Sequence, residues 1–171
     1  MNAPDVLVVP DWIKRIADEE RKRDAMRVQE EETVARKADL VRLHGQRLIN
    51  ELQAAVKRDV EAFEHEFAGE RAFAVIFEAS ASDGGFIVRR EGPSAVSLHV
   101  DPRLEAASMS CHYRFPTANG LPPREVRLEL AFAGDAGEIL QIKHHGTGQV
   151  FLTADSLSEF LLVPVFTGRP R

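Results

Sequence analysis

The feature of this sequence that most constrains its fold is a long stretch without helix-breaking residues. Residues 11–68 contain no proline and a single glycine, Gly45. Because proline and glycine are the residues least compatible with a helix interior, this stretch predicts a long helix. Asp11, which follows Pro10, is its expected N-cap. Gly45 costs ~1 kcal/mol relative to alanine inside a helix, so it marks either a bend or a break between two helices.

The predicted helix has two parts of different character. Among residues 18–32 only Ala25, Met26 and Val28 are apolar, and most of the others are charged. A helix this polar is either exposed to solvent or meets a partner through a narrow stripe. Farther along, apolar residues recur at steps of three and four, first as a thin seam typical of a coiled coil and then, over residues 48–67, as a wide core-facing side. This stripe comprises Val34, Ala38, Val41, Leu48, Leu52, Ala55, Val56, Phe63 and Phe67.

The length of the predicted helix exceeds what the rest of the chain can cover. About 58 residues at ~1.5 Å each would span ~87 Å, and a sheet built from the remaining residues would cover less than half of that. The uncovered part must pair with a partner, fold back or stand in solvent. We therefore predict a homo-oligomer, or another protein partner, bound through the N-terminal helix. The interface candidates are Trp12, Ile16, Val34, Ala38 and Val41.

The residues before the helix predict an extended arm. Pro4 and Pro10 bracket four apolar residues at positions 6–9. Such an arm either docks on its own domain, as chain termini usually do, or pairs as an edge strand with a partner chain. We therefore divide the chain into residues 1–45, an arm with a charged, coiled-coil-like extension, and residues 46–171, an α+β domain.

After Gly69 the hydrophobic period changes from near 3.6 to 2. Turn-forming residues then recur about every ten residues, among them Asp83-Gly84-Gly85, Asn119-Gly120, residues 134–137 and Gly146-Thr147-Gly148. This spacing is typical of an antiparallel meander. We predict strands near residues 71–79, 86–91, 95–100, 106–115, 124–133, 138–145 and 149–153. The expected fold class is therefore α+β, with the long helix packed on a meander sheet of six to seven strands.

Alternation within the strands assigns the two faces of the sheet. In the third to fifth strands one face is apolar and the other polar, and residues 48–67 and 157–161 are the helical candidates to cover the apolar face. The first strand is apolar on both sides, which predicts that both its faces are covered, with a partner interface as the alternative. The apolar-face residues are Val96, Leu98, Val100, Met109, Cys111, Tyr113, Phe115, Val126, Leu128, Leu130 and Phe132.

A short helix is expected to close the chain. Ser156 and Glu159 have the spacing of a capping box, which places its N-terminus at Ser156. Leu157, Phe160 and Leu161 supply its apolar side. Pro164 is expected to end it.

Composition limits the compartment and the ligand classes. The formal net charge is −5, which argues against nucleic-acid binding. A lone cysteine, Cys111, excludes an intramolecular disulfide and fits a reducing compartment. Neither a signal peptide nor a run of ~20 apolar residues is present, so we predict a cytoplasmic protein that does not contact a membrane.

The sequence contains only weak candidates for catalytic or metal-binding residues. His99 and His112 fall on the polar face of neighbouring strands, and Glu129 could join them as a third metal ligand. Two unrelated histidines on a solvated surface are the simpler interpretation. Cys111 on the apolar face behaves as a small hydrophobic residue, and His144-His145 beside Gly146 is typical of a hairpin turn.

These observations favour an interaction or assembly protein without a cofactor over an enzyme. Two other hypotheses remain open. A curved sheet under a helix could enclose a ligand cavity lined by Met109, Tyr113, Phe115 and Leu130, which a packed core would exclude. The polar sheet face could instead bind nucleic acid, although few aromatic residues lie there to stack on bases. The basic residues in question are Arg89, Arg90, Arg114, Arg127 and Lys143.

Overall fold

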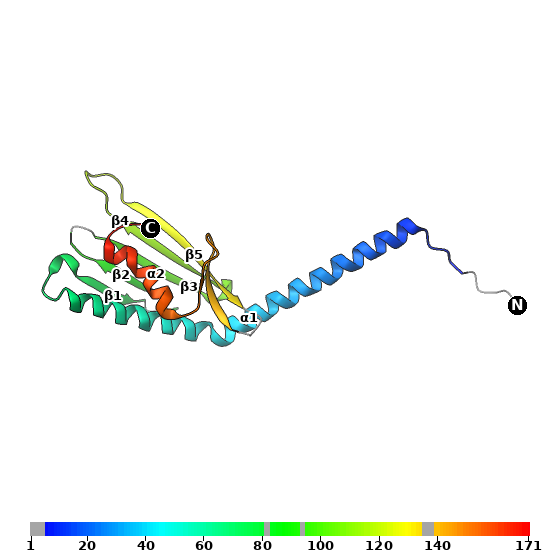
Figure 1. Cartoon of the computed structure of the whole chain (residues 1–171), viewed down its shortest axis with the longest axis horizontal. Helices are drawn as coiled ribbons and strands as arrows, with labels where there is room; N and C mark the ends of the chain where they lie inside the picture. Colours follow the sequence, from blue (N-terminus) through cyan, green and yellow to red (C-terminus); the bar gives the residue numbers. More distant parts are fainter. Residues whose placement is uncertain (1–5, 81–82, 93–94, 135–138) are drawn as a thin grey trace. The chain divides into compact units, whose positions relative to one another are not determined.

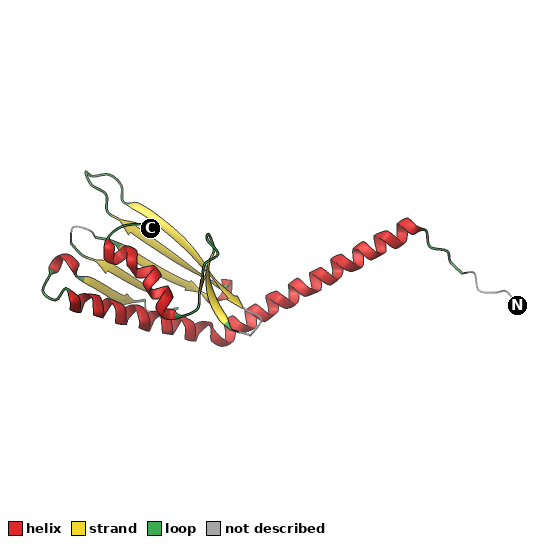
Figure 2. Ribbon diagram, viewed as in Figure 1, coloured by secondary structure: helices red, strands yellow, loops and turns green. Residues whose placement is uncertain are grey.

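The computed structural model describes residues 6–80, 83–92, 95–134 and 139–171. It has an α+β fold in which a long helix, a seven-stranded antiparallel sheet and a short helix follow one another (Figures 1 and 2). Two compact units, Met1–Arg36 and Lys37–Arg171, divide the chain. Residues 1–5 of the predicted arm, residues 135–137 of one predicted turn and residue 138 at the start of the strand predicted near 138–145 lie outside the described residues.

The predicted long helix is confirmed as α1, Asp11–Glu66. The carbonyl of Pro10 accepts hydrogen bonds from the amides of Ile13 and Lys14 at 3.0 and 3.2 Å. Asp11 is therefore the first helical residue and not the N-cap, and its carboxylate lies where the helix dipole favours negative charge. The buried positions recur at helical spacing and are Leu40, Val41, Gly45, Ile49, Leu52, Ala55, Val56 and Val60.

Gly45 neither breaks the helix nor separates two helices. It is buried within α1, and a Cβ at this position would lie 2.8 Å from Cδ2 of Leu104. Leu104 begins η2, the short 3-10 helix Leu104–Ala106 between two strands. The glycine therefore serves the close approach of η2 to α1, a tertiary requirement that the local sequence does not reveal.

The seven strands form one meander in which each strand pairs only with its sequence neighbours, and the sheet curls into a half-barrel. The predicted number of strands and their order along the chain are confirmed. The strands are β1 Val75–Ala79, β2 Phe86–Arg90, β3 Ser97–Arg103, β4 Ser108–Phe115, β5 Arg124–Gly134, β6 Leu140–His144 and β7 Val150–Phe151.

The strand register confirms the predicted apolar face. Tyr113 lies opposite Leu98 on one side and Val126 on the other. Both helices cover this face, as expected. The core combines side chains of α1, of the sheet and of α2, the C-terminal helix Ala154–Thr167. The main contributors are Ile49, Leu52, Val56, Phe86, Leu98, Met109, Leu130, Phe132, Leu157, Leu161 and Leu162.

The prediction for the first strand was wrong in two respects. Residues 71–73 form η1, a 3-10 helix, and the strand begins only at Val75. In addition, β1 is an edge strand, in which Val75 is buried but Ile76 and Phe77 are only half-buried. Phe73 leaves the predicted strand face because its ring stacks on Phe67 at a centroid distance of 4.2 Å.

The last helix begins earlier and ends later than predicted. Thr153 is the N-cap, and its hydroxyl oxygen accepts a hydrogen bond from the amide of Ser156 at 3.1 Å. The predicted capping box at Ser156 was therefore wrong by one turn. Pro164 lies inside α2, which continues to Thr167 and ends where Gly168 adopts a φ of 69°.

The assignment of Thr153 as the N-cap of α2 can be tested by substitution. Replacing Thr153 with alanine is expected to lower the free energy of unfolding by about 1 kcal/mol, because the amide of Ser156 loses its acceptor. Urea unfolding monitored by circular dichroism measures the change. Thr153→Ser keeps the acceptor oxygen and is expected to unfold near the wild-type midpoint. Equal losses in both variants would contradict the capping role.

Pro164 leaves a backbone carbonyl without its helical donor, because proline has no N–H to give to Phe160 four residues earlier. The Arg171 guanidinium supplies the missing bond, with Nη2 donating to the Phe160 carbonyl at 3.1 Å. The same guanidinium lies 4.3 Å from the centroid of the Phe160 ring. The tail after α2 is thereby attached to the middle of the helix.

Polar and aromatic contacts fasten α2 to the end of α1. The Ser158 hydroxyl donates to Asp59 at 2.7 Å, and Arg58 donates to Asp155 at 2.8 Å. At the ends of the helices the Phe63 and Phe166 rings stack at a centroid distance of 4.1 Å. The two helices therefore act as one cover over the sheet.

Candidate functional site

The part of α1 in the first compact unit exposes large apolar side chains. Trp12 is 57% exposed, Ile16 is 48% exposed and Val34 is 68% exposed. Val34 follows Ile16 by about five whole turns at ~3.6 residues per turn, so the two lie on the same side of the helix, and Ile16 lies one turn from Trp12. We call Trp12, Ile16 and Val34 the N-terminal stripe. Trp12 and Ile16 are neighbours, and an exposed tryptophan beside a β-branched residue is typical of a surface that meets another molecule. Val34 lies ~27 Å farther along the same side, at ~1.5 Å per residue.

The other two predicted interface residues lie in the second unit and differ in exposure. Ala38 is exposed. Val41 is only 4% exposed and belongs to the core of the sheet domain, where it cannot reach a partner. We therefore leave Val41 out of the candidate surface.

Between Ile16 and Val34 the helix carries charges in blocks. Residues 18–20 and 30–32 are acidic, whereas residues 21–23 are basic. Ion pairs within the helix join Arg23 to Glu20 at 2.9 Å and Arg27 to Asp24 at 2.7 Å. All four side chains are more than half exposed, so each pair contributes only a few tenths of a kcal/mol. The ion pairs support the helix, while the blocks set the charge pattern that a partner would meet.

The histidine pair on the outer sheet face has the predicted register but gathers no third ligand. His99 lies directly opposite His112, with ring centroids 6.5 Å apart. Glu129 lies opposite Ser110 and accepts a hydrogen bond from its hydroxyl at 2.8 Å, whereas His112 faces Arg127. Within the described parts of the chain, no three His, Cys, Asp or Glu side chains come together as metal ligands.

The basic residues considered for nucleic-acid binding do not form a cluster. Arg90 belongs to the inner side, where Nη1 donates to the Phe166 carbonyl at 2.7 Å. Arg89 pairs with Glu78 at 2.6 Å, and Arg114 lies opposite Glu125 in the register. The outer face therefore mixes both signs of charge, which disfavours phosphate binding.

Cys111 is buried on the inner face, as predicted. Burial, with a smaller contribution from the charge of Glu129, raises the pKa of its thiol well above the usual range. A thiol in this state is neither a nucleophile nor a metal ligand at neutral pH.

The predicted hairpin at residues 144–149 is also confirmed, with the amide of His144 bonded to the Gln149 carbonyl at 2.8 Å.

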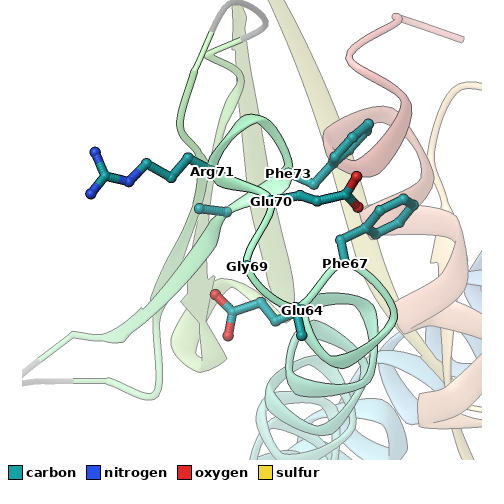
Figure 3. Close-up of a pocket in the computed structure, with 8 residues that line it drawn as sticks. Glu64, Phe67, Gly69, Glu70, Arg71 and Phe73 are labelled. Atoms are coloured by element: carbon teal, nitrogen blue, oxygen red, sulfur yellow. The ribbon is translucent and has the colours of Figure 1, made fainter.

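A hollow of about 350 Å³ lies beside the loop that joins α1 to β1 (Figure 3). Glu64 is already engaged, because its carboxylate accepts the amide of Val75 at 3.3 Å. Figure 3 shows the side chains of Arg71 and Glu64 pointing away from the rings of Phe67 and Phe73. The charged groups therefore do not converge on one point, and the hollow lacks the geometry of a catalytic site.

The cavity expected between helix and sheet has a different lining from the predicted one. Met109 and Leu130 are each 1% exposed and belong to the packed core. Tyr113 and Phe115 do line a cavity, of about 190 Å³, between the sheet and α2 with the tail that follows it. Its other walls are Val126, Leu128, His144, Thr147, Phe160, Pro164, Pro170 and Arg171. Sequence reasoning missed this lining because the residues come from four separate segments without a shared motif.

Among the described residues, none of the helices has an apolar stretch long enough to cross a bilayer. In comparisons with family models, curated proteins and solved structures, no match to this chain was found.

Proposed function

We propose that this protein is an interaction or assembly protein that self-associates through the N-terminal stripe of α1. The observation that carries the proposal is the exposure of Trp12, Ile16 and Val34 on a helical segment that adds nothing to the core. The first buried residue among the described ones is Leu40, so the fold of the sheet domain does not account for residues 11–36. Cys111, as a lone buried thiol, suits a reducing compartment such as the cytoplasm.

The charge blocks favour a second copy of this chain in antiparallel orientation as the partner. In a parallel, in-register pair, residues 21–23 would lie beside the same basic residues of the other copy, and residues 30–32 beside the same acidic ones. In an antiparallel pair, the basic block of each copy can lie beside the acidic block of the other. Since opposite charges near an interface favour one orientation and like charges oppose it, the antiparallel arrangement is the better one.

The size of the stripe sets the expected affinity. Each copy contributes three large side chains, and full burial of such a side chain gives about 2 kcal/mol. The gross gain from both copies, about 12 kcal/mol, is comparable to the ~4–15 kcal/mol lost as translational and rotational freedom. We therefore expect association in the micromolar range or weaker, which requires measurement over a range of concentrations.

Sedimentation equilibrium of the full chain from ~1 μM to ~1 mM tests the proposal. The wild type is expected to self-associate with increasing concentration. Val34→Glu is expected to raise the dissociation constant at least tenfold, because burying a carboxylate in the stripe costs more than ~1.4 kcal/mol. A strict monomer at the highest concentration would overturn the proposal.

Val28→Glu is the matched control for this experiment. Val28 lies on the same helix and is 40% exposed, but its side chain is displaced from Val34 by about a third of a turn. The Val28→Glu substitution therefore introduces the same charge into the same helix, but outside the N-terminal stripe. Its dissociation constant is expected to stay near that of the wild type, and an equal weakening would show that added charge alone disrupts the complex.

A further inference from the structure

The apolar cavity between the sheet, α2 and the C-terminal tail has the features of a small binding site. The inner face of β5 is fully covered at Leu130 and Phe132 but only half-covered at Val126 and Leu128. Helix α2 ends at Thr167, and Pro170 and Arg171 of the tail that follows it form part of the cavity wall. The result is a cavity of about 190 Å³ rather than a packed core. This volume lies below the ~300–1,000 Å³ typical of sites for drug-sized ligands, so it suits a smaller molecule.

Three polar groups in the wall remain able to donate hydrogen bonds, and one of them is the Thr147 hydroxyl, whose oxygen accepts the amide of Gln149 at 3.3 Å. The Arg171 guanidinium uses a donor on the Phe160 carbonyl at 3.1 Å, and a guanidinium has five. Nδ1 of His144 accepts the amide of Thr147 at 3.0 Å, which leaves the Nε2–H of the ring as another donor.

A fourth polar group of the wall, the Tyr113 hydroxyl, is already hydrogen-bonded. The Tyr113 hydroxyl donates to the Leu161 carbonyl at 2.5 Å. Burial raises the pKa of this phenol well above its usual range, so it stays neutral and holds α2 on β4. Tyr113 therefore contributes its ring to the apolar lining and no free donor.

The charge of the lining points to the chemistry of the ligand. Although the whole chain carries a net charge of −5, the side chains around this cavity include the Arg171 guanidinium and no aspartate or glutamate. Apolar walls that hold a guanidinium and an imidazole N–H are complementary to an apolar body that ends in a carboxylate.

We propose that this cavity binds a small carboxylic acid with an apolar body, such as a medium-chain fatty acid. The carboxylate pairs with the Arg171 guanidinium and the Nε2–H of His144. The hydrocarbon body lies against Tyr113, Phe115 and Leu128. This inference is independent of the self-association proposed above, because the cavity uses no residue of the N-terminal stripe.

Titration of the full chain with sodium octanoate, monitored by amide chemical shifts, tests the proposal. Saturable shifts are expected around residues 113–115, 126–128 and 144–147, with a dissociation constant of about 0.1–1 mM for a ligand of this size. Octan-1-ol, which keeps the body and lacks the charge, is expected to bind at least tenfold more weakly. Absence of shifts at these positions, or equal binding of octan-1-ol, would overturn the proposal.

Two variants separate charge recognition from the apolar fit. Arg171→Gln is expected to weaken octanoate binding at least tenfold, whereas Arg169→Gln, a neighbouring exposed arginine outside the wall, is expected to leave it unchanged. Leu128→Trp fills the cavity and is expected to abolish binding. Unchanged affinity in Arg171→Gln would refute the proposed carboxylate contact even if Leu128→Trp failed to fold.

Discussion

Gly84→Ala is expected to lower the free energy of unfolding of this protein by about 3 kcal/mol, one of the largest losses from adding a single methyl group. Gly84 has a φ of 72°, in the left-handed region, where alanine costs roughly 1–2 kcal/mol. A Cβ there would lie 2.6 Å from Cγ2 of Ile49, which is fully buried in α1. Because neither atom can move without disturbing the core, overpacking adds about 1–3 kcal/mol.

Gly120→Ala is the matched control for the backbone contribution. Gly120 has a φ of 70°, almost the same as Gly84, but no heavy atom lies within 4 Å of the position its Cβ would take. Its loss is therefore expected to be the strain alone, about 1 kcal/mol. Urea unfolding of both variants measures the two losses in free energy of unfolding. Their difference, about 2 kcal/mol, is the contribution from packing of the β1–β2 hairpin on α1. Equal losses would mean that this hairpin does not rest on Ile49.

The inner face of the sheet could be predicted from the sequence because its signal is local. Leu98, Cys111 and Leu130 each lie in an alternating run, and successive strand residues point to opposite faces whatever surrounds them. The long helix was predictable for a similar reason, since a run of residues without breakers needs no information from elsewhere in the chain. The meander order followed from the short turns, which leave each strand beside its neighbour.

Departures from the prediction occur where distant residues override the local pattern. Pro164 remains inside a helix because Arg171 supplies the donor that the proline lacks. Phe73 leaves the predicted strand to stack on Phe67. Gly45 lies inside the helix, and a side chain at this position would collide with Leu104. In each case the deciding contact joins two segments whose proximity the sequence does not encode in any pattern.

The candidate surface shows the same limit. Val34 and Val41 are seven residues apart on the same side of the helix, so periodicity treats them alike. The structure separates them, because Val41 is covered by the core and Val34 is not. The cavity could not be predicted at all, since Val126, His144 and Arg171 meet only through the curl of the sheet and the return of the tail.

Cross-linking between engineered cysteines is expected to reveal the antiparallel orientation as an all-or-none result. The midpoint between the basic block at residues 21–23 and the acidic block at residues 30–32 falls beside Met26, which is 61% exposed. In an antiparallel pair the two copies of Met26 meet, whereas the two copies of Ile16 lie about 30 Å apart at ~1.5 Å per residue. A Met26→Cys protein is therefore expected to cross-link to itself with a short bismaleimide, and an Ile16→Cys protein is not.

A mixed experiment fixes the register and supplies the control. Ile16→Cys protein combined with Lys37→Cys protein is expected to give a heterodimeric cross-link, because these positions lie about equally far on either side of Met26. The native Cys111 adds little background, since burial raises the pKa of its thiol and keeps it out of solvent. Self-cross-linking of Ile16→Cys as efficient as that of Met26→Cys would instead establish a parallel pair and contradict the charge argument, while leaving the N-terminal stripe as the contact surface.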